Sequence, residues 1–109
     1  MSKKNPRKTN GKVHPVGRKE EIYILSLFVT GILPNSTRAI VNINAICEKY
    51  LKGRYELEII DIYQQPSLAI SEKIVAVPVL IRRFPLPEIR MIGDLSDIGK
   101  VLNGFHLID

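Results

Sequence analysis

The stretch IYILSLFVTGILPNSTRAIVNINAIC, residues 22–47, decides the fold. Residues 22–29 are apolar except for one serine, which is typical of a strand buried on both faces. A turn is expected over residues 30–34. Asn35 or Ser36 can then cap a helix by accepting hydrogen bonds from its free N–H groups. This strand–turn–helix corner is the strongest local signal in the chain.

The helix that follows the corner should bury one apolar face. The residues on that face share helical spacing, and they are Ile40, Ile43, Cys47, Tyr50 and Leu51. Gly53 is expected to end the helix. Cys47 lies about three turns from the corner. Because a reactive thiolate favours a positive, partly exposed setting such as a helix N-terminus, we interpret Cys47 as a small core residue.

The rest of the chain predicts three further strands and two further helices. We expect strands at residues 55–62, 77–81 and 89–92, and helices at residues 68–75 and after Gly93, the last one capped by Asp94 or Ser96. The order β-α-β-α-β-β-α contains βαβ-type crossovers, which favour a mixed sheet covered by helices. We therefore predict an α/β fold with the thioredoxin-like element order.

A thioredoxin-like domain places a Cys-x-x-Cys pair at the strand-to-helix corner. This chain has Pro34-Asn35-Ser36 there, so the architecture lacks the redox chemistry and points to binding or regulation. In this topology a cis proline begins the third strand and faces the corner. Val77-Pro78 stands at that place, and we favour a cis bond over an ordinary proline at a strand start.

Charge divides the chain into two parts. Residues 1–19 carry seven basic and no acidic residues, whereas the remaining 90 residues have a net charge of −2. We predict that residues 1–19 form a disordered basic tail and that residues 20–109 form one domain. The tail has no aromatic residues to stack on bases, so a solubilising extension is favoured over nucleic-acid binding. Without an apolar span, signal peptide or cysteine pair, we expect a cytoplasmic protein and no membrane partner.

The residue inventory argues against an enzyme. One histidine in the predicted domain and one cysteine cannot build a zinc site or a Cys-His pair, and neither a phosphate loop nor a dinucleotide fingerprint is present. Asp94, Ser96 and Asp97 are better explained as helix caps than as an acid–base cluster. We predict no catalytic residue, metal or cofactor. Arg82-Arg83 could mark a partner surface, although solvated charges are the simpler interpretation.

Local preferences are shallow in residues 62–109. Residues 70–81 are rich in β-branched side chains, so their helical part could equally form strand. Gly99 and Gly104 lower the helix propensity of the last segment. The X-Pro bonds at Pro78, Pro85 and Pro87 have only a small trans preference. Two packings of this half could therefore be close in free energy.

The chain closely resembles the KaiB family of small circadian-clock proteins. The resemblance covers roughly residues 22–108. The matching stretches are Leu27 to Gly31, Pro34 to Ser36, Arg38-Ala39, Ile60 to Ile62, Pro66, Leu68-Ala69, Lys73-Ile74, Val77 to Leu80, Pro85, Pro87, Arg90, and Ile92 to Ser96. The turn Pro34-Asn35-Ser36 and the run from Ile92 to Ser96 distinguish this family from a generic thioredoxin.

This resemblance implies a non-enzymatic regulator. KaiB-like proteins bind the N-terminal ATPase ring of KaiC, capture KaiA and displace a thioredoxin-like sensor histidine kinase. Carried over by position, the KaiC-facing surface comprises Asp61, Pro66, Ser67, Leu68, Lys73 and Pro78. The family also switches between a tetrameric ground state with a rearranged C-terminal half and a monomeric thioredoxin-like state. The corresponding switch region here comprises Pro78, Pro85, Pro87, Gly93, Asp94, Gly104 and His106.

Some positions depart from the family's clock members. Glu58 stands where those members carry a lysine, and His106 stands where they carry an acidic residue. Since the KaiA-capturing surface is thought to be basic, Glu58 argues against KaiA as a partner. We therefore expect a KaiB-like protein that works with a KaiC homologue, as a tetramer or dimer in its ground state. The alternative is a thioredoxin-like protein in redox or stress physiology.

Overall fold

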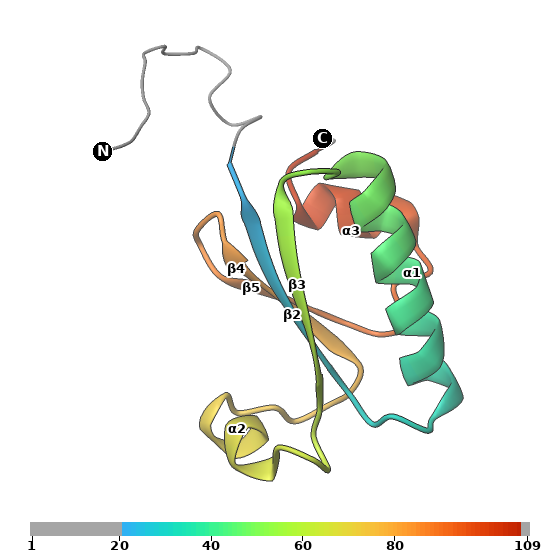
Figure 1. The fold of residues 1–109 in the computed structure, drawn as a ribbon, viewed down its shortest axis with the longest axis vertical. Helices are drawn as coiled ribbons and strands as arrows, with labels where there is room; N and C mark the ends of the chain where they lie inside the picture. Colours follow the sequence, from blue (N-terminus) through green and yellow to red (C-terminus); the bar gives the residue numbers. More distant parts are fainter. Residues whose placement is uncertain (1–20, 108–109) are drawn as a thin grey trace.

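A four-stranded sheet lies between helices in the computed structural model, which describes residues 21–107. The elements are β2 (Tyr23–Val29), α1 (Pro34–Tyr50), β3 (Tyr55–Asp61), α2 (Pro66–Ser71), β4 (Val79–Phe84), β5 (Ile89–Ile92) and α3 (Ile98–Gly104) (Figure 1). The predicted order β-α-β-α-β-β-α is confirmed. Residues 1–19, predicted as a basic tail, lie outside the described residues.

The sheet has the strand order β3-β2-β4-β5. β2 pairs in parallel with β3, and the β2–β4 and β4–β5 pairs are antiparallel. Apart from the half-exposed Ile24, every residue of β2 is buried, as its apolar sequence predicts for a central strand. β3 and β5 are the edge strands.

The larger part of the core lies between the sheet and the two longer helices. α1 contributes Ala39, Ile43, Ile46 and Cys47, all of which are buried against β2 and β4 side chains. α3 closes the same face with Val101, Leu102 and the following Phe105. The hydroxyl of Tyr23 donates to the Phe105 carbonyl oxygen at 2.7 Å, which ties the start of β2 to the end of α3.

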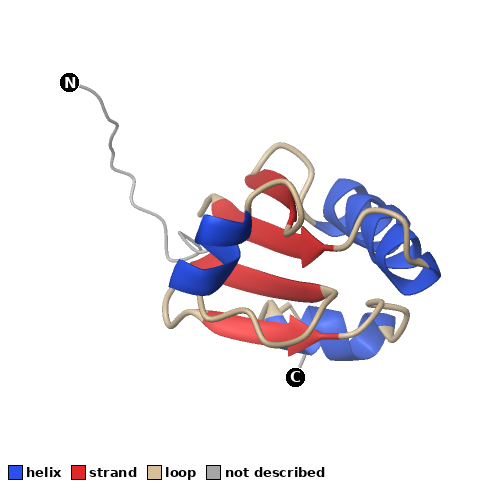
Figure 2. Cartoon of the chain, turned by 90° about the horizontal axis from the view of Figure 1, so that it is seen from below, coloured by secondary structure: helices blue, strands red, loops and turns tan. Residues whose placement is uncertain are grey.

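A smaller core lies on the opposite face of the sheet, below α2. Phe28, Ile60, Val79 and Ile81 form its buried part, and Leu68 of α2 packs against them with Ile62, Ile74 and Val77. Figure 2 shows α2 and the other two helices on opposite sides of the strands. α2 has only six residues and buries none of them completely.

The helix caps differ from the sequence prediction. α1 begins at Pro34, its N-cap residue is Leu33, and no side chain caps it. Proline is favoured at the first helical position because its missing N–H would have no partner there. Ser36 lies inside the helix, where its Oγ accepts a hydrogen bond from the Thr30 N–H at 3.1 Å. Asp97 caps α3 by accepting from the Lys100 N–H, so the prediction of Asp94 or Ser96 was wrong.

The second helix and third strand are also shifted. α2 begins before the predicted range and ends at Ser71, and Val75 is 93% exposed. The helix stops because Lys73 adopts the left-handed conformation, with φ 58°, and the Ile74 N–H then reaches back to the Ala69 carbonyl. β4 correspondingly begins at Val79 and ends at Phe84, beyond the predicted range of residues 77–81.

The remaining backbone features follow the proline and glycine positions. The Val77-Pro78 bond is cis, as predicted, and so are Phe84-Pro85 and Leu86-Pro87. Gly53 lies three residues beyond the end of α1 with φ 80°, a conformation that favours glycine. Among residues 21–107 no helix is long and apolar enough to cross a membrane.

Candidate functional site

The predicted partner-facing residues gather at one end of the sheet. Val29, the last residue of β2, pairs with Asp61, the last residue of β3, and Phe28 pairs with Val79 at the start of β4. The carboxyl ends of β2 and β3, the corner before α1, α2 and Pro78 therefore meet at the end of the molecule that lies lowest in Figure 1.

Asp61 links the corner to the loop after β3. One oxygen of its carboxylate, Oδ1, accepts a hydrogen bond from the Tyr63 N–H at 2.8 Å. The other oxygen lies against Gly31, where an added Cβ would be only 2.7 Å from Oδ2. A side chain at position 31 would therefore displace the Asp61 carboxylate from this place.

α2 presents three of the predicted residues to solvent. Pro66 and Ser67 in its first turn and Lys73 beyond its last turn are exposed, whereas Leu68 is half-buried against the smaller core. Pro78 is fully buried, and its carbonyl accepts from the Gly93 N–H at 3.0 Å. Pro78 therefore supports this surface from below, and its side chain is not available for direct contact.

Large exposed apolar side chains surround α2, and the sequence interpretation missed them. Tyr63 is 76% exposed, Ile70 is 78% exposed, and Val75 is 93% exposed. We call six of the exposed residues of this segment the α2 surface, which consists of Tyr63, Pro66, Ser67, Ile70, Lys73 and Val75. Exposed apolar side chains that gather into one patch are typical of a protein–protein contact site. A signal was present, since residues 68–77 contain more apolar residues than one short helix can bury.

Apart from Pro78, which precedes β4, the predicted switch residues lie in the hairpin between β4 and β5 and around α3. Pro85 and Pro87 form the hairpin turn. Gly93 follows β5 with φ 122°, a conformation that favours glycine. Gly104 is the last residue of α3, and His106 is an exposed residue in the left-handed conformation, with φ 61°.

Asp94 joins this region to α1. Its carboxylate accepts a hydrogen bond from Arg38 Nε at 3.1 Å, and its carbonyl accepts one from the Asn42 side chain at 2.8 Å. Hydrogen bonds from Ser96, and then from Arg38, hold the pKa of Asp94 below its ordinary value. The loop before α3 is thus fixed to α1 by a charged group that stays ionised over the physiological range.

Arg82 contradicts the interpretation of the Arg82-Arg83 pair as surface charges. It is 0% exposed and points toward α3. Its Nη1 donates to the Gly104 carbonyl at 2.7 Å and its Nη2 donates to the Pro87 carbonyl at 2.8 Å. Nε is buried without a hydrogen-bond partner in the described part of the chain. One buried cation therefore holds together three switch-region segments: β4, the proline turn and the end of α3.

The only thiol of the chain lies away from the corner. Cys47 is buried, and burial first and Glu48 second raise its pKa to about 12. The thiol is protonated at neutral pH, which confirms its interpretation as a small core residue. No group of histidine, cysteine and carboxylate side chains within residues 21–107 is arranged to hold a metal ion.

A sequence model of the KaiB domain matches residues 26–106. The chain belongs to the KaiB family. One member, the circadian clock oscillator protein KaiB of Thermostichus vulcanus, is 48% identical over 86 residues, which is 79% of this chain and 80% of the relative. The protein of the same name from Prochlorococcus marinus (strain MIT 9312) is 49% identical, with coverage of 79% and 82%.

Solved structures confirm the thioredoxin-like fold of this KaiB family member. The N-terminal domain of Synechococcus elongatus SasA superposes with a TM-score of 0.66 at 19% identity, covering 100% of this chain and 97% of that domain. Chloroplastic thioredoxin z superposes with a TM-score of 0.65 at 16% identity, covering 84% of each chain. At these identities the likeness concerns the fold alone.

Proposed function

We propose that this protein is a non-enzymatic regulator that binds a KaiC-type ATPase ring and modulates its phosphorylation or signalling. The exposed apolar α2 surface, in a chain of the KaiB family, is the observation that carries this proposal. Relatives that are nearly half identical are named as circadian clock oscillator proteins, which supports a clock-type regulatory role. Asp61 and Pro78 hold the ends of the segment that bears this surface.

The chemistry of the α2 surface suits a protein partner. Ile70 and Tyr63 offer apolar area that water covers in the isolated molecule, and Lys73 adds a cation at the edge. Burying exposed aromatic and aliphatic side chains drives association, and a few such residues usually carry most of the binding free energy. We propose that these side chains make the central contact with the ATPase ring.

Binding to a purified KaiC-type ATPase in the presence of ATP tests this proposal. Native mass spectrometry would detect the complex, and Ile70→Asp should weaken it about tenfold or more, because a carboxylate would have to be desolvated at the contact. Val41→Asp is the matched control, since Val41 is 62% exposed on α1, across the sheet from α2. An absent wild-type complex, or equal losses for the two variants, would contradict the proposal.

The family resemblance also suggests which other proteins this chain would or would not bind. We propose that a thioredoxin-like sensor histidine kinase competes for the same ATPase ring, since the family resemblance implies such displacement. We do not expect KaiA to bind, because the exposed Glu58 on β3 reverses the charge of the clock members there. Self-association into a tetramer or dimer belongs to the proposed ground state.

We further propose that residues 62–109 have a second packing. Three non-glycine residues of this half are held in the left-handed conformation, namely Lys73, Leu95 and His106. Such residues cost free energy that the surroundings must offset. Together with the unpartnered Nε of Arg82, they reduce the free-energy difference that favours the thioredoxin-like packing over a second packing. NMR spectra should show two slowly exchanging sets of peaks for residues 62–109 but not for β2, and a single set would contradict this proposal.

The redox alternative gains no support from the site. The corner where a cysteine pair would act contains none, and the Cys47 thiol is buried with a raised pKa. We expect no disulfide reductase activity in an insulin-reduction assay, and measurable turnover that depends on Cys47 would favour the alternative.

A further inference from the structure

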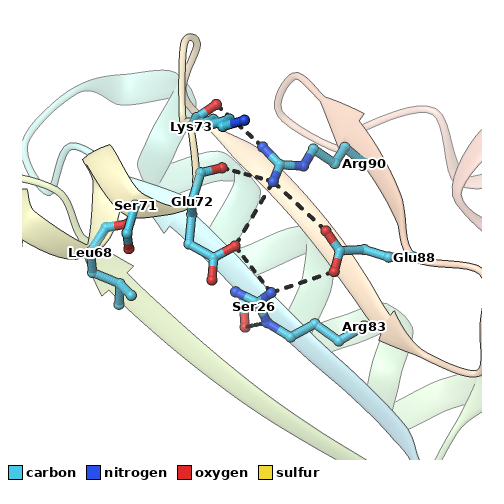
Figure 3. Close-up of polar contacts among 8 residues, drawn as sticks. All are labelled: Ser26, Leu68, Ser71, Glu72, Lys73, Arg83, Glu88 and Arg90. Atoms are coloured by element: carbon cyan, nitrogen blue, oxygen red, sulfur yellow. Dashed lines mark hydrogen bonds and ion pairs between the residues drawn. The ribbon is translucent and has the colours of Figure 1, made fainter.

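Four charged side chains from three segments form a closed ring beside the end of α2. Glu72 is the C-cap residue of α2, Arg83 lies on β4, Glu88 precedes β5, and Arg90 lies on β5. Arg83 Nη1 lies 3.2 Å from Glu72 and 3.7 Å from Glu88. Arg90 Nη2 lies 3.8 Å from Glu72 and 3.7 Å from Glu88 (Figure 3). Each cation therefore contacts both anions.

The ring also holds the backbone at the end of α2. Arg90 Nη2 donates to the Glu72 carbonyl at 2.8 Å, and Nη1 donates to the Lys73 carbonyl at 3.4 Å (Figure 3). The last carbonyl groups of a helix lack partners within the helix, and an arginine that pairs with them complements the helix dipole. Arg90 thus fixes the left-handed turn at Lys73, within the segment that bears the α2 surface.

The other arginine anchors the ring to the centre of the sheet. Arg83 Nε donates to the Ser26 Oγ at 2.9 Å, and Ser26 is buried on the central strand β2. α2 itself cannot supply comparable anchoring, because it has six residues and none is fully buried. A helix this short is not stable alone and depends on contacts with its surroundings.

We propose that Glu72, Arg83, Glu88 and Arg90 form an electrostatic latch that fixes α2 on the sheet and thereby positions the α2 surface for its partner. These are positioning residues, because they lie beside the α2 surface and act through the end of the helix. The use of the latch in partner binding rests on the proposed function. That the latch fixes α2 on the sheet does not depend on the proposed function.

The latch should respond to ionic strength. Its side chains are between 27% and 44% exposed, so water and salt reach them. Single ion pairs of this exposure contribute little, but four alternating charges reinforce one another. Raising the salt concentration from about 0.05 M to about 1 M shortens the screening length from well above the ring's dimensions to about 3 Å. The contacts between α2 and the sheet should loosen accordingly.

Amide hydrogen exchange tests the latch without any partner. The amides of Ala69, Glu72, Lys73 and Ile74 donate within or just beyond α2, so their exchange reports its opening. We expect Glu88→Gln and Arg90→Gln each to speed their exchange about two- to fivefold at low salt, with smaller effects at high salt. Arg90→Lys should recover part of the protection. The double variant should show coupling between the two sites that disappears in high salt.

A matched pair controls for loss of charge as such. Lys52→Gln and Glu56→Gln remove exposed charges that form no side-chain hydrogen bond or ion pair with another residue of the described range 21–107, and they should leave α2 exchange unchanged and uncoupled. Unchanged exchange in Glu88→Gln and Arg90→Gln would overturn the latch, whatever the partner does. Faster exchange with unaltered affinity for the KaiC-type ATPase would overturn its positioning role. A wild-type protein that fails to bind the ATPase would instead contradict the proposed function, with the exchange result still deciding the latch.

Discussion

Arg82 is a charged side chain that the fold buries completely, and two of its three guanidinium nitrogens donate to carbonyl oxygens. Gly104 and Pro87 supply these oxygens, and both belong to segments that follow β4 in the chain. A buried donor that binds two acceptors is costly to remove, because both acceptors lose their partner in a place without water. The cation also lies at the C-terminal end of α3, where the helix dipole favours positive charge.

Arg82→Met should therefore lower the free energy of unfolding by about 2–3 kcal/mol, since it keeps the apolar stem but leaves two carbonyl groups unpaired. Urea denaturation would measure the change. Arg38→Met is the control, because Arg38 is 59% exposed in its pair with Asp94 and should cost about 1 kcal/mol or less. Similar losses for the two variants would show that the buried contacts of Arg82 contribute no more than a surface pair.

Because of Cys47, the stability of the folded protein should decrease at alkaline pH. Its pKa is about 12 in the folded protein, compared with 9.0 ordinarily, so the unfolded chain loses the thiol proton first. The stability that the protonated Cys47 thiol contributes to the folded protein is fully present below pH 9 and is lost as the pH rises from 9 toward 12. We expect the wild-type urea midpoint to fall more steeply between pH 8 and pH 10.5 than that of Cys47→Ala. An equal decrease of the urea midpoint with pH in the two proteins would contradict the raised pKa of Cys47.

At the scale of elements, α2 is the part of the structure with the weakest internal support. Its end depends on Lys73, a non-glycine residue with φ 58°. The left-handed conformation costs about 1–2 kcal/mol for a residue with a Cβ atom, and glycine avoids most of this cost. The same position contributes a cation to the α2 surface, so stability and partner binding place opposite demands on it.

Lys73→Gly should accordingly raise the free energy of unfolding by about 0.5 kcal/mol, after allowing for the greater freedom of glycine in the unfolded chain. Thermal and urea unfolding would measure this gain. Lys52→Gly, at an exposed site whose φ is not positive, should be neutral or destabilising. The idea fails if the two substitutions have the same sign and size. A simultaneous loss of affinity for the KaiC-type ATPase would identify the Lys73 ammonium as a binding group.

The elements also show how far the sequence could be interpreted. β2, α1, β5 and the overall order were predictable, because each segment has a clear apolar pattern or a strong turn beside it. The limits of α2 and β4 were not predictable, because Ile74, Val75 and Val77 suit a strand as well as a helix. The left-handed turn at Lys73 decides between them, and no glycine indicates it.

At the scale of the whole molecule, tertiary packing decides which side chains are buried where the local sequence pattern allows either outcome. Arg82 and Arg83 are adjacent in sequence and alternate across β4, so one faces α3 and the other faces α2. Nothing in the pair itself indicates which one is buried. The exposure of Ile70 and Val75 could not be predicted from the sequence for the same reason. An apolar residue is expected in the core unless the structure shows that no other element covers it. The family resemblance predicts where a partner surface lies, and the excess of apolar residues in residues 68–77 hints at its apolar character, but which side chains are exposed required the structure.

The edge strand β3 has one more consequence. In the described part of the chain β3 pairs only with β2, so its outer backbone groups could accept a strand from another copy. If two such edges met antiparallel about Leu57, each Glu56 would lie opposite the Glu58 of the other copy. Like charges directly opposite one another are destabilising. In this register the two glutamates would therefore disfavour pairing between the β3 edges of two copies.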